Sequence, residues 1–278
     1  MKERILFLSD LHDCHIHWYG TTTADRLEKM VKDVEAAGKF DRLIVMGDVS
    51  LDFWGWNEGG SYLQETPHSN TDHFMKTYMP RLPKPSSILP GNHEQYGEEK
   101  WREITGCGRE YVIETDSALF VILDSFSGNL DPSEHSDGTY QPVNCDFIDK
   151  AMADCPDKPV FLLSHFFEMD RESDRFKAIL KNNDRILAMM VGHTHRSAVL
   201  DAGEDAGHKP ILQCGNYSYS GEKEPGICFW GWRELIFEDD GTIRSFYHTP
   251  YSEYRHGSGA FVQEEGDQDE WTAQGGEL

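Results

Sequence analysis

Short, uninterrupted apolar runs that end in polar residues recur along this chain. The first run covers residues 4–9 and holds Ile5, Leu6, Phe7 and Leu8 in succession. Contiguous apolar residues predict a strand buried on both faces, because a half-exposed strand alternates apolar and polar side chains. Further strands of this kind are predicted at residues 43–46, 86–89, 159–164 and 186–191.

Stretches with helical spacing separate these strands. Between residues 23 and 37, Leu27, Met30 and Val34 recur at helical spacing, and Gly38 suits the end of the helix. Other helices are predicted at residues 71–79, 98–104, 144–154 (capped by Asn144) and 171–181, and a strand pair at 110–113 and 118–123. The pattern is typical of an α/β domain, and 278 residues suffice for one large domain of that class.

The pattern changes after residue 196. Strand-like segments separated by turns such as Asp240-Gly241 predict antiparallel strands that complete a second sheet, at residues 197–200, 209–214, 227–237 and 242–248. Residues 255–278 are polar, acidic and rich in glycine, which is typical of a loosely held extension. The expected organisation is therefore a single domain over residues 1–254, followed by this extension.

Residues 51–70 show neither helical nor strand periodicity and are interpreted as an inserted loop. The segment begins with the aromatic cluster Phe53-Trp54-Gly55-Trp56 and contains several glycines. A loop of this length inside a compact domain is usually functional or mobile.

The residues that end the apolar runs are candidate ligands. They are Asp10, His12, Asp48, Asn92, His165, His193 and His195, with His93 beside Asn92. Any one of them alone is more simply a turn residue, but the carboxyl ends of strands in open α/β sheets are where sites are built. Oxygen and imidazole donors in this mixture predict Mn, Fe or Zn rather than Ca or Mg alone. We therefore expect two divalent or trivalent transition metal ions, with Asp48 as the bridging carboxylate.

At these residues the chain resembles the calcineurin-like metallophosphoesterase family. The motifs that carry the resemblance occur in the family's order over roughly residues 4 to 196: Asp10-x-His12, Gly47-Asp48, Gly91-Asn92-His93-Glu94, His165 and Gly192-His193-x-His195. The resemblance implies a four-layer sandwich of two mixed β-sheets flanked by helices, with the site at one edge. It also implies that one metal takes Asp10, His12, Asp48 and His195, and the other takes Asp48, Asn92, His165 and His193.

The expected reaction is hydrolysis of a phosphate ester. Two cations lower the pKa of a bridging water, so that a metal-bridging hydroxide attacks phosphorus and the ester oxygen leaves. His93 is the candidate acid that protonates the leaving oxygen, and it is not expected to be a metal ligand. Its orienting partner could be Asp52 or Glu94.

The substrate is expected to be a small phosphate mono- or diester, with a nucleotide or cyclic nucleotide as a candidate. Protein serine/threonine phosphatases of the superfamily carry an Asp-Arg-Gly element after the bridging aspartate, and the residues after Asp48 contain no such arginine. That alternative is therefore weaker. Trp54 and Trp56 could form a wall on which a base stacks, or they could cover a sheet edge or a subunit contact. Asn92 and Arg196 are further candidate substrate contacts, although a surface arginine is the simpler interpretation of Arg196.

Charge and composition narrow the remaining classes. The 26 basic and 49 acidic side chains give a net charge of −23, which disfavours extended nucleic acid and anionic membranes as partners. The N-terminus enters a strand-like run at once, so we expect no signal peptide and a cytoplasmic protein with six free cysteines. A non-catalytic metal-binding scaffold of the same fold remains an alternative, but every ligand position is filled.

Overall fold

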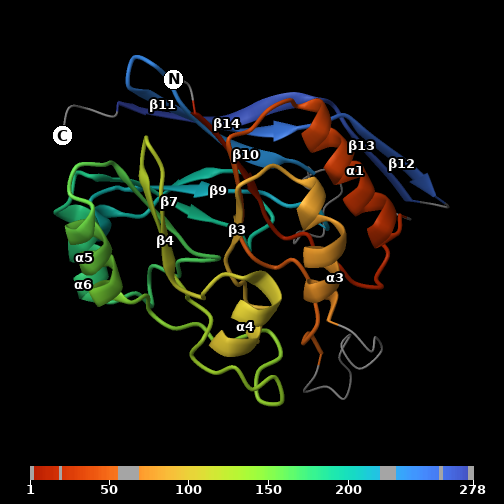
Figure 1. Ribbon diagram of the computed structural model, residues 1–278, viewed down its shortest axis with the longest axis horizontal. Helices are drawn as coiled ribbons and strands as arrows, with labels where there is room; N and C mark the ends of the chain where they lie inside the picture. The colour runs from red at the N-terminus through yellow and green to blue at the C-terminus, as the bar shows by residue number, and fades with distance from the viewer. Residues whose placement is uncertain (1–2, 19–20, 56–68, 220–229, 257–258, 275–278) are drawn as a thin grey trace.

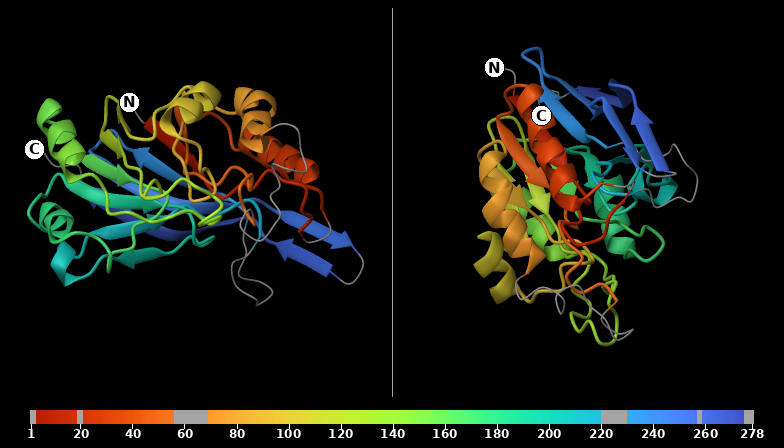
Figure 2. Two further views of the ribbon diagram at one scale, coloured as in Figure 1. Left: turned by 90° about the horizontal axis from the view of Figure 1, so that it is seen from below. Right: turned by 90° about the vertical axis from the view of Figure 1, so that its right-hand side faces the viewer.

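The computed structural model of the protein describes residues 3–18, 21–55, 69–219, 230–256 and 259–274. Two six-stranded mixed sheets pack face to face, and helices cover their outer faces (Figures 1 and 2). The expected four-layer α/β sandwich is therefore confirmed.

The first sheet has the strand order β14-β11-β10-β1-β2-β3. Its strands are β1 (Glu3–Leu8), β2 (Arg42–Val45), β3 (Ser86–Ile88), β10 (Trp232–Phe237), β11 (Thr242–Thr249) and β14 (Gly266–Gln274). Strands β1, β2 and β3 run parallel, and β10 joins β1 in the antiparallel direction. The three parallel strands thus present their carboxyl ends at the same edge.

The second sheet has the strand order β4-β5-β6-β7-β9-β8. Its strands are β4 (Tyr111–Glu114), β5 (Leu119–Ile122), β6 (Val160–Leu163), β7 (Ile186–Val191), β8 (Val199–Asp201) and β9 (Pro210–Gln213). Strands β5, β6, β7 and β9 are parallel, whereas the edge strands β4 and β8 are antiparallel to their neighbours.

Among the described α-helices, all but α4 (Glu98–Thr105) begin where a polar side chain caps the first turn. The helices are α1 (Thr23–Ala36), α3 (Asn70–Thr77), α4 (Glu98–Thr105), α5 (Cys145–Asp154) and α6 (Asp174–Lys181), with single 3-10 turns at Met79–Arg81 and Glu204–Ala206. Thr22, Ser69 and Asn144 each accept a hydrogen bond from a backbone N–H of the helix that follows. Helix α6 begins at residue 174 rather than 171, because the Ser173 side chain accepts the N–H of Phe176.

Three apolar clusters fill the spaces between the four layers. The first joins the first sheet to α1, α3 and α4, through residues such as Leu27, Phe74 and Trp101. The second lies between the two sheets, and the third joins the second sheet to α5 and α6. In the described part of the chain, no helix is both long enough and apolar enough to cross a membrane.

Two expectations for the C-terminal third are wrong. Strands β10 and β11 belong to the first sheet, and β9 pairs with β7 in the parallel direction, so these strands do not form one antiparallel second sheet. Residues 259–274 are not a loose extension, since β14 pairs with β11 along its length and β13 (Gly259–Gln263) pairs with β12 (Ser252–His256). The backbone N–H and C=O groups of β11 need a partner on their open side, and β14 supplies it.

Candidate metal centre

The candidate ligands come from five strand ends in the two sheets. In the first sheet, Asp10 and His12 follow β1, Asp48 follows β2, and Asn92 with His93 follows β3. In the second sheet, His165 follows β6, and His193 with His195 follows β7. The sandwich brings these two sets to one edge, where their side chains form a single cluster.

Asp48 is the carboxylate shared between the groups of this cluster. Three sets of side chains have ligand atoms within 4.8 Å of one another: Asp10, His12 and His195; His12, Asp48 and His93; and Asp48, His165 and His193. Asp48 Oδ2 lies 3.0 Å from His165 Nε2 and 3.7 Å from His12 Nε2. Asp10 Oδ1 lies 3.2 Å from His195 Nε2.

The backbone at these positions adopts a conformation that side chains usually avoid. Positive φ angles occur at Asp10 (51°), His12 (47°), Asp48 (51°), His193 (66°) and His195 (57°). Such strain costs roughly 1–3 kcal/mol per residue and gathers at functional sites. The backbone conformation that points these side chains into the cluster therefore lowers the stability of the fold.

Two glycines permit the strand ends to approach one another. A Cβ on Gly91 would lie 2.0 Å from Asp48 Oδ1, and a Cβ on Gly192 would lie 2.0 Å from Ser9 Oγ and 2.9 Å from Asp10 Oδ2. Any side chain at these positions would displace a candidate ligand.

Neighbouring oxygens orient the imidazole rings. His165 Nδ1 lies 2.7 Å from the Met46 carbonyl, and His195 Nδ1 is hydrogen-bonded to the Tyr219 carbonyl. Both rings therefore turn Nε2 towards the carboxylates, the arrangement found where histidine binds a metal. His193 Nδ1 lies 2.8 Å from the side-chain oxygen of Asn92.

Several buried polar atoms of the cluster have no hydrogen-bond partner within the described part of the chain. They are Asp10 Oδ1, both ring nitrogens of His12, His165 Nε2 and His93 Nδ1. A buried polar atom without a partner costs about 1–3 kcal/mol, so a group of them indicates a missing partner. The nitrogen and carboxylate donors fit a metal site.

Histidines set the charge of the two buried aspartates. Burial raises the pKa of Asp10, but the neighbouring His195 and His165 outweigh it and hold the pKa below its ordinary value. Burial likewise acts to raise the pKa of Asp48, yet His165 and His93 hold that pKa well below its ordinary value. Both carboxylates are therefore anionic at neutral pH, as metal ligands must be.

The imidazoles respond to burial and to the same carboxylates. Burial lowers the pKa of His12 to about 4, and burial also lowers the pKa of His193. At His165 the effect of burial is overcome by Asp48, which raises the pKa to about 10. The pKa of His195 is raised in the same way by its aspartate partner. The carboxylates beside His165 and His195 thus stabilise positive charge at these two rings.

Glu94 and Asp52 both support the backbone and do not orient His93. The Glu94 carboxylate accepts the backbone N–H groups of Asp48, Val49, Ser50 and Gly91, and so joins the turns after β2 and β3. Burial and the neighbouring Asp48 raise the pKa of Glu94 to about 8.

Asp52 caps the start of α3. Its carboxylate accepts the backbone N–H groups of Asn70 and Thr71 and the Tyr96 hydroxyl. Neither proposed orienting partner of His93 is therefore in place for that role.

Besides Asp48, a second carboxylate lies beside His93: that of Asp137, which the sequence does not indicate. Asp137 Oδ1 is 3.5 Å from His93 Nε2 and accepts a hydrogen bond of 2.9 Å from the Asn92 side-chain amide. It belongs to the loop between β5 and α5, where nothing in the local sequence distinguishes it from other acidic loop residues.

Aromatic rings contact the candidate ligands within the described residues. The rings that contact the candidate ligands are Trp18 and Tyr219 beside His12, and Phe126 and Phe166 beside His193. Trp54 is 46% exposed, and Trp56 lies outside the described residues. Arg196 is exposed, next to His195 in the chain.

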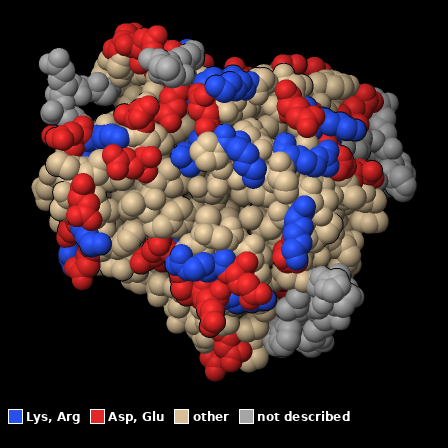
Figure 3. Space-filling view, viewed as in Figure 1, with Lys and Arg blue, Asp and Glu red and all other residues tan. Residues whose placement is uncertain are grey.

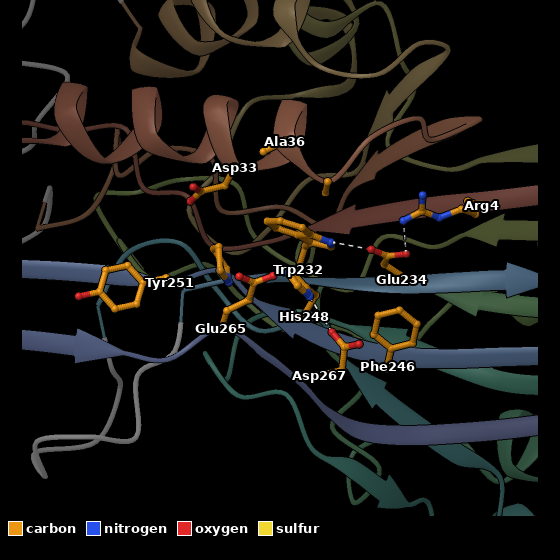
Figure 4. A pocket seen from close by; sticks show the side chains of 12 residues that line it. Arg4, Asp33, Ala36, Trp232, Glu234, Phe246, His248, Tyr251, Glu265 and Asp267 are labelled. Atoms are coloured by element: carbon orange, nitrogen blue, oxygen red, sulfur yellow. Dashed lines mark hydrogen bonds and ion pairs between the residues drawn. The ribbon is translucent and has the colours of Figure 1, made fainter.

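A cavity of about 490 Å³ lies away from this cluster, between α1 and the strands β10, β11 and β14 (Figure 4). Acidic side chains in its wall already have partners: Glu234 pairs with Arg4 and Trp232, and Asp267 with His248. The reactive groups are thus concentrated at the strand ends and not in this cavity.

Known proteins place this arrangement in context. The family model for calcineurin-like phosphoesterases matches residues 3–197. A purple acid phosphatase from yellow lupin (Lupinus luteus) seeds is similar with a TM-score of 0.54 and 13% identity, over 94% of this chain and 53% of that chain. The chain spans about half the length of the lupin enzyme, and at this identity the likeness concerns the fold alone.

Two further solved structures align at lower scores. Vacuolar Protein Sorting 29 from Cryptosporidium parvum gives a TM-score of 0.41 and 10% identity, over 96% of this chain and 99% of that chain. A metallophosphoesterase from Sphaerobacter thermophilus gives a TM-score of 0.39 and 13% identity, over 86% and 85%. Comparison with curated proteins gives no significant match.

The family match covers well over half of the chain and includes every candidate ligand from Asp10 to His195. The two mixed sheets of this chain, flanked by helices, agree with the sandwich of that family. The chain therefore belongs to the calcineurin-like phosphoesterase family.

Proposed function

We propose that this protein is a dinuclear metal-dependent hydrolase of a small phosphate mono- or diester. The observation that carries the proposal is the position of Asp48, whose Oδ2 lies 3.7 Å from His12 Nε2 and 3.0 Å from His165 Nε2, one histidine from each proposed ligand set. A carboxylate shared in this way is what a pair of metal ions about 3.5–4 Å apart requires. Family membership supports the reaction class and leaves the substrate open.

The donor atoms divide into two sets around Asp48. Asp10, His12, Asp48 and His195 would hold one ion, and Asp48, His165, His193 and Asn92 would hold the other. Manganese, iron and zinc suit this mixture of imidazole and carboxylate donors. When bound, two such cations activate water at neutral pH and neutralise charge on a phosphoryl group.

The protein's own side chains supply orientation and a proton. His93 is nearly buried, and its Nε2 lies 3.8 Å from Asp48 Oδ2, so the ring faces the cluster. From that position a proton on Nε2 can reach an ester oxygen that leaves from the cluster, which is general acid catalysis. The backbone N–H of His93 donates to Asp48 Oδ1 at 3.1 Å and thereby ties the acid to the bridging carboxylate.

The first experiment is metal reconstitution. Protein stripped of metal should hydrolyse neither para-nitrophenyl phosphate nor bis(para-nitrophenyl) phosphate, and activity should return when Mn, Fe or Zn is added. Asp48→Asn is the control, because loss of the shared charge should weaken binding of both ions together. Full occupancy of two ions without hydrolysis of either ester would overturn the proposal and favour a scaffold.

A further inference from the structure

Asp137 places a third carboxylate at the open side of the metal cluster. Its side chain is 64% exposed, whereas the side chains of Asp10 and Asp48 are 0% and 2% exposed. It lies 3.5 Å from His93 Nε2 and accepts a hydrogen bond from the Asn92 amide. A substrate that approaches His93 and Asn92 from solvent therefore meets this carboxylate.

The loop that carries Asp137 is built to hold it there. Gly138 has a φ of +72°, and a Cβ at that position would lie 2.6 Å from the Asn92 carbonyl oxygen. The next residue, Thr139, pairs with Ser127 across the base of the loop, and its carbonyl accepts the Gly128 N–H. The backbone that follows Asp137 is thus held in place at Gly138 and Thr139.

The buried aspartates Asp10 and Asp48 already have histidines as counter-charges, and Asp137 adds a further negative charge nearer the surface. The ion pairs of Asp10 and Asp48 are all with histidines of the cluster. Two bound cations would add positive charge at that depth. Asp137, in contrast, stands beside His93, the acid proposed for the leaving oxygen, so the other oxygens on the same phosphorus would lie close to its carboxylate.

We propose that Asp137 makes this site select phosphodiesters over phosphomonoesters, an inference that rests on the proposed phosphoesterase function. A diester carries one negative charge, whereas a monoester carries nearly two at pH 7 and above. The ester oxygen of a diester's second substituent can lie near the carboxylate without a charge of its own, but the corresponding monoester oxygen is anionic. Two like charges about 4 Å apart near a protein surface repel enough to change a rate ratio by roughly tenfold.

The test compares two substrates that share a leaving group. At about pH 8, kcat/KM is measured for bis(para-nitrophenyl) phosphate and para-nitrophenyl phosphate with wild-type, Asp137→Asn and Asp137→Ala proteins of measured metal content. Asp137→Asn removes the charge and keeps an oxygen that can accept the Asn92 hydrogen bond. We expect both variants to shift the monoester-to-diester ratio towards the monoester by roughly tenfold.

Glu134→Gln is the matched control, since Glu134 lies on the same loop and bonds to Asn129 rather than to the cluster. It removes the same charge and should leave the ratio unchanged. A ratio in Asp137→Asn within twofold of wild type would overturn the inference. So would a loss of both activities in Asp137→Ala alone, because that result would reduce Asp137 to a support for Asn92.

A binding measurement separates this inference from the proposed function. Calorimetry with inorganic phosphate and with dimethyl phosphate reports affinity for a dianion and a monoanion without turnover. The metal-loaded Asp137→Asn protein should gain affinity for phosphate relative to dimethyl phosphate by about the same factor. If the wild-type protein hydrolyses neither ester, the proposed function fails, and this affinity ratio still decides whether Asp137 discriminates by charge.

Discussion

At the scale of single residues, His93 lies close both to a possible ligand group and to the carboxylates of Asp48 and Asp137. Its side chain belongs to one of the three possible ligand groups, together with His12 and Asp48. Its Nδ1 has no hydrogen-bond partner within the described residues, and its Nε2 faces both Asp48 and Asp137. The acid role requires that His93 stays off the metals, so metal content is the measurement that separates this role from that of a ligand.

The His93→Ala variant should retain both metals and lose activity in proportion to the leaving group's need for a proton. Loss of a general acid lowers the rate by about 10²–10⁴. We expect a loss of that size for an alkyl ester and a much smaller loss for the para-nitrophenyl ester, whose leaving group is stable without a proton. Single-turnover rates for the two esters check this.

The outcome that would contradict the acid role is specific. An equal loss on both esters, or a protein with one metal instead of two, would assign His93 to the metal set. His17→Ala is the matched control, because His17 is exposed and lies near the first motif in the chain.

The sequence predicts the ligand cluster better than it predicts what surrounds the cluster. Each candidate ligand ends an apolar run, and that local pattern is enough to bring all of them to one edge once strands are parallel. The roles of these residues stay predictions. Asp137 was missed because only a tertiary contact with Asn92 distinguishes it from acidic neighbours such as Asp131.

At the scale of elements, the strand β14 closes the open side of the first sheet. Trp271 in β14 packs against the cluster between the two sheets, with its ring centroid 6.3 Å from that of Phe161 in β6. Strand β14 thus links the first sheet to the second.

We expect Trp271→Ala to lower the free energy of unfolding by about 1–3 kcal/mol, less than for a fully buried tryptophan because Trp271 is only partly buried. Urea unfolding followed by far-UV circular dichroism measures the change. Thr272→Ala is the control, since Thr272 is exposed on the same strand and should change stability by less than about 0.5 kcal/mol. Equal stability of all three proteins would restore the view of a loose C-terminal extension.

Element type was easier to predict than element partnership. The helix bounds agree with the expectation to within a few residues, because capping side chains such as Asn144 and Ser173 act locally. The prediction that β10 and β11 belong to the second sheet was wrong, because the pairing of β10 with β1 joins residues more than 220 positions apart. Apolar alternation along one strand contains no information about which distant strand is its neighbour.

At the scale of the whole molecule, the net charge of −23 surrounds a site that is proposed to bind anions. On the face shown in Figure 3, lysines and arginines lie among the acidic side chains rather than in a separate patch. The charge is therefore expected to oppose the approach of a phosphate ester at long range, while metal ions bound at the proposed site would attract it at short range.

Salt should consequently speed the capture of substrate. Raising monovalent salt from about 20 to about 200 mM shortens the screening length severalfold and weakens the long-range repulsion more than the short-range attraction. We expect kcat/KM to rise a few-fold for the diester and further for the dianionic monoester, at constant metal content. A fall of kcat/KM with salt would contradict this, because it would show that long-range attraction by the site outweighs repulsion by the net charge of the protein.

The Glu94 carboxylate has a consequence for how this chain can vary. Because one buried group accepts backbone N–H groups from two separate turns, neither turn can change its path without leaving donors unpaired in the other. Substitutions in residues 47–50 and 91–94 should then be tolerated in combinations more often than singly. Substitutions in the two motifs would therefore be coupled, although more than 40 residues separate them.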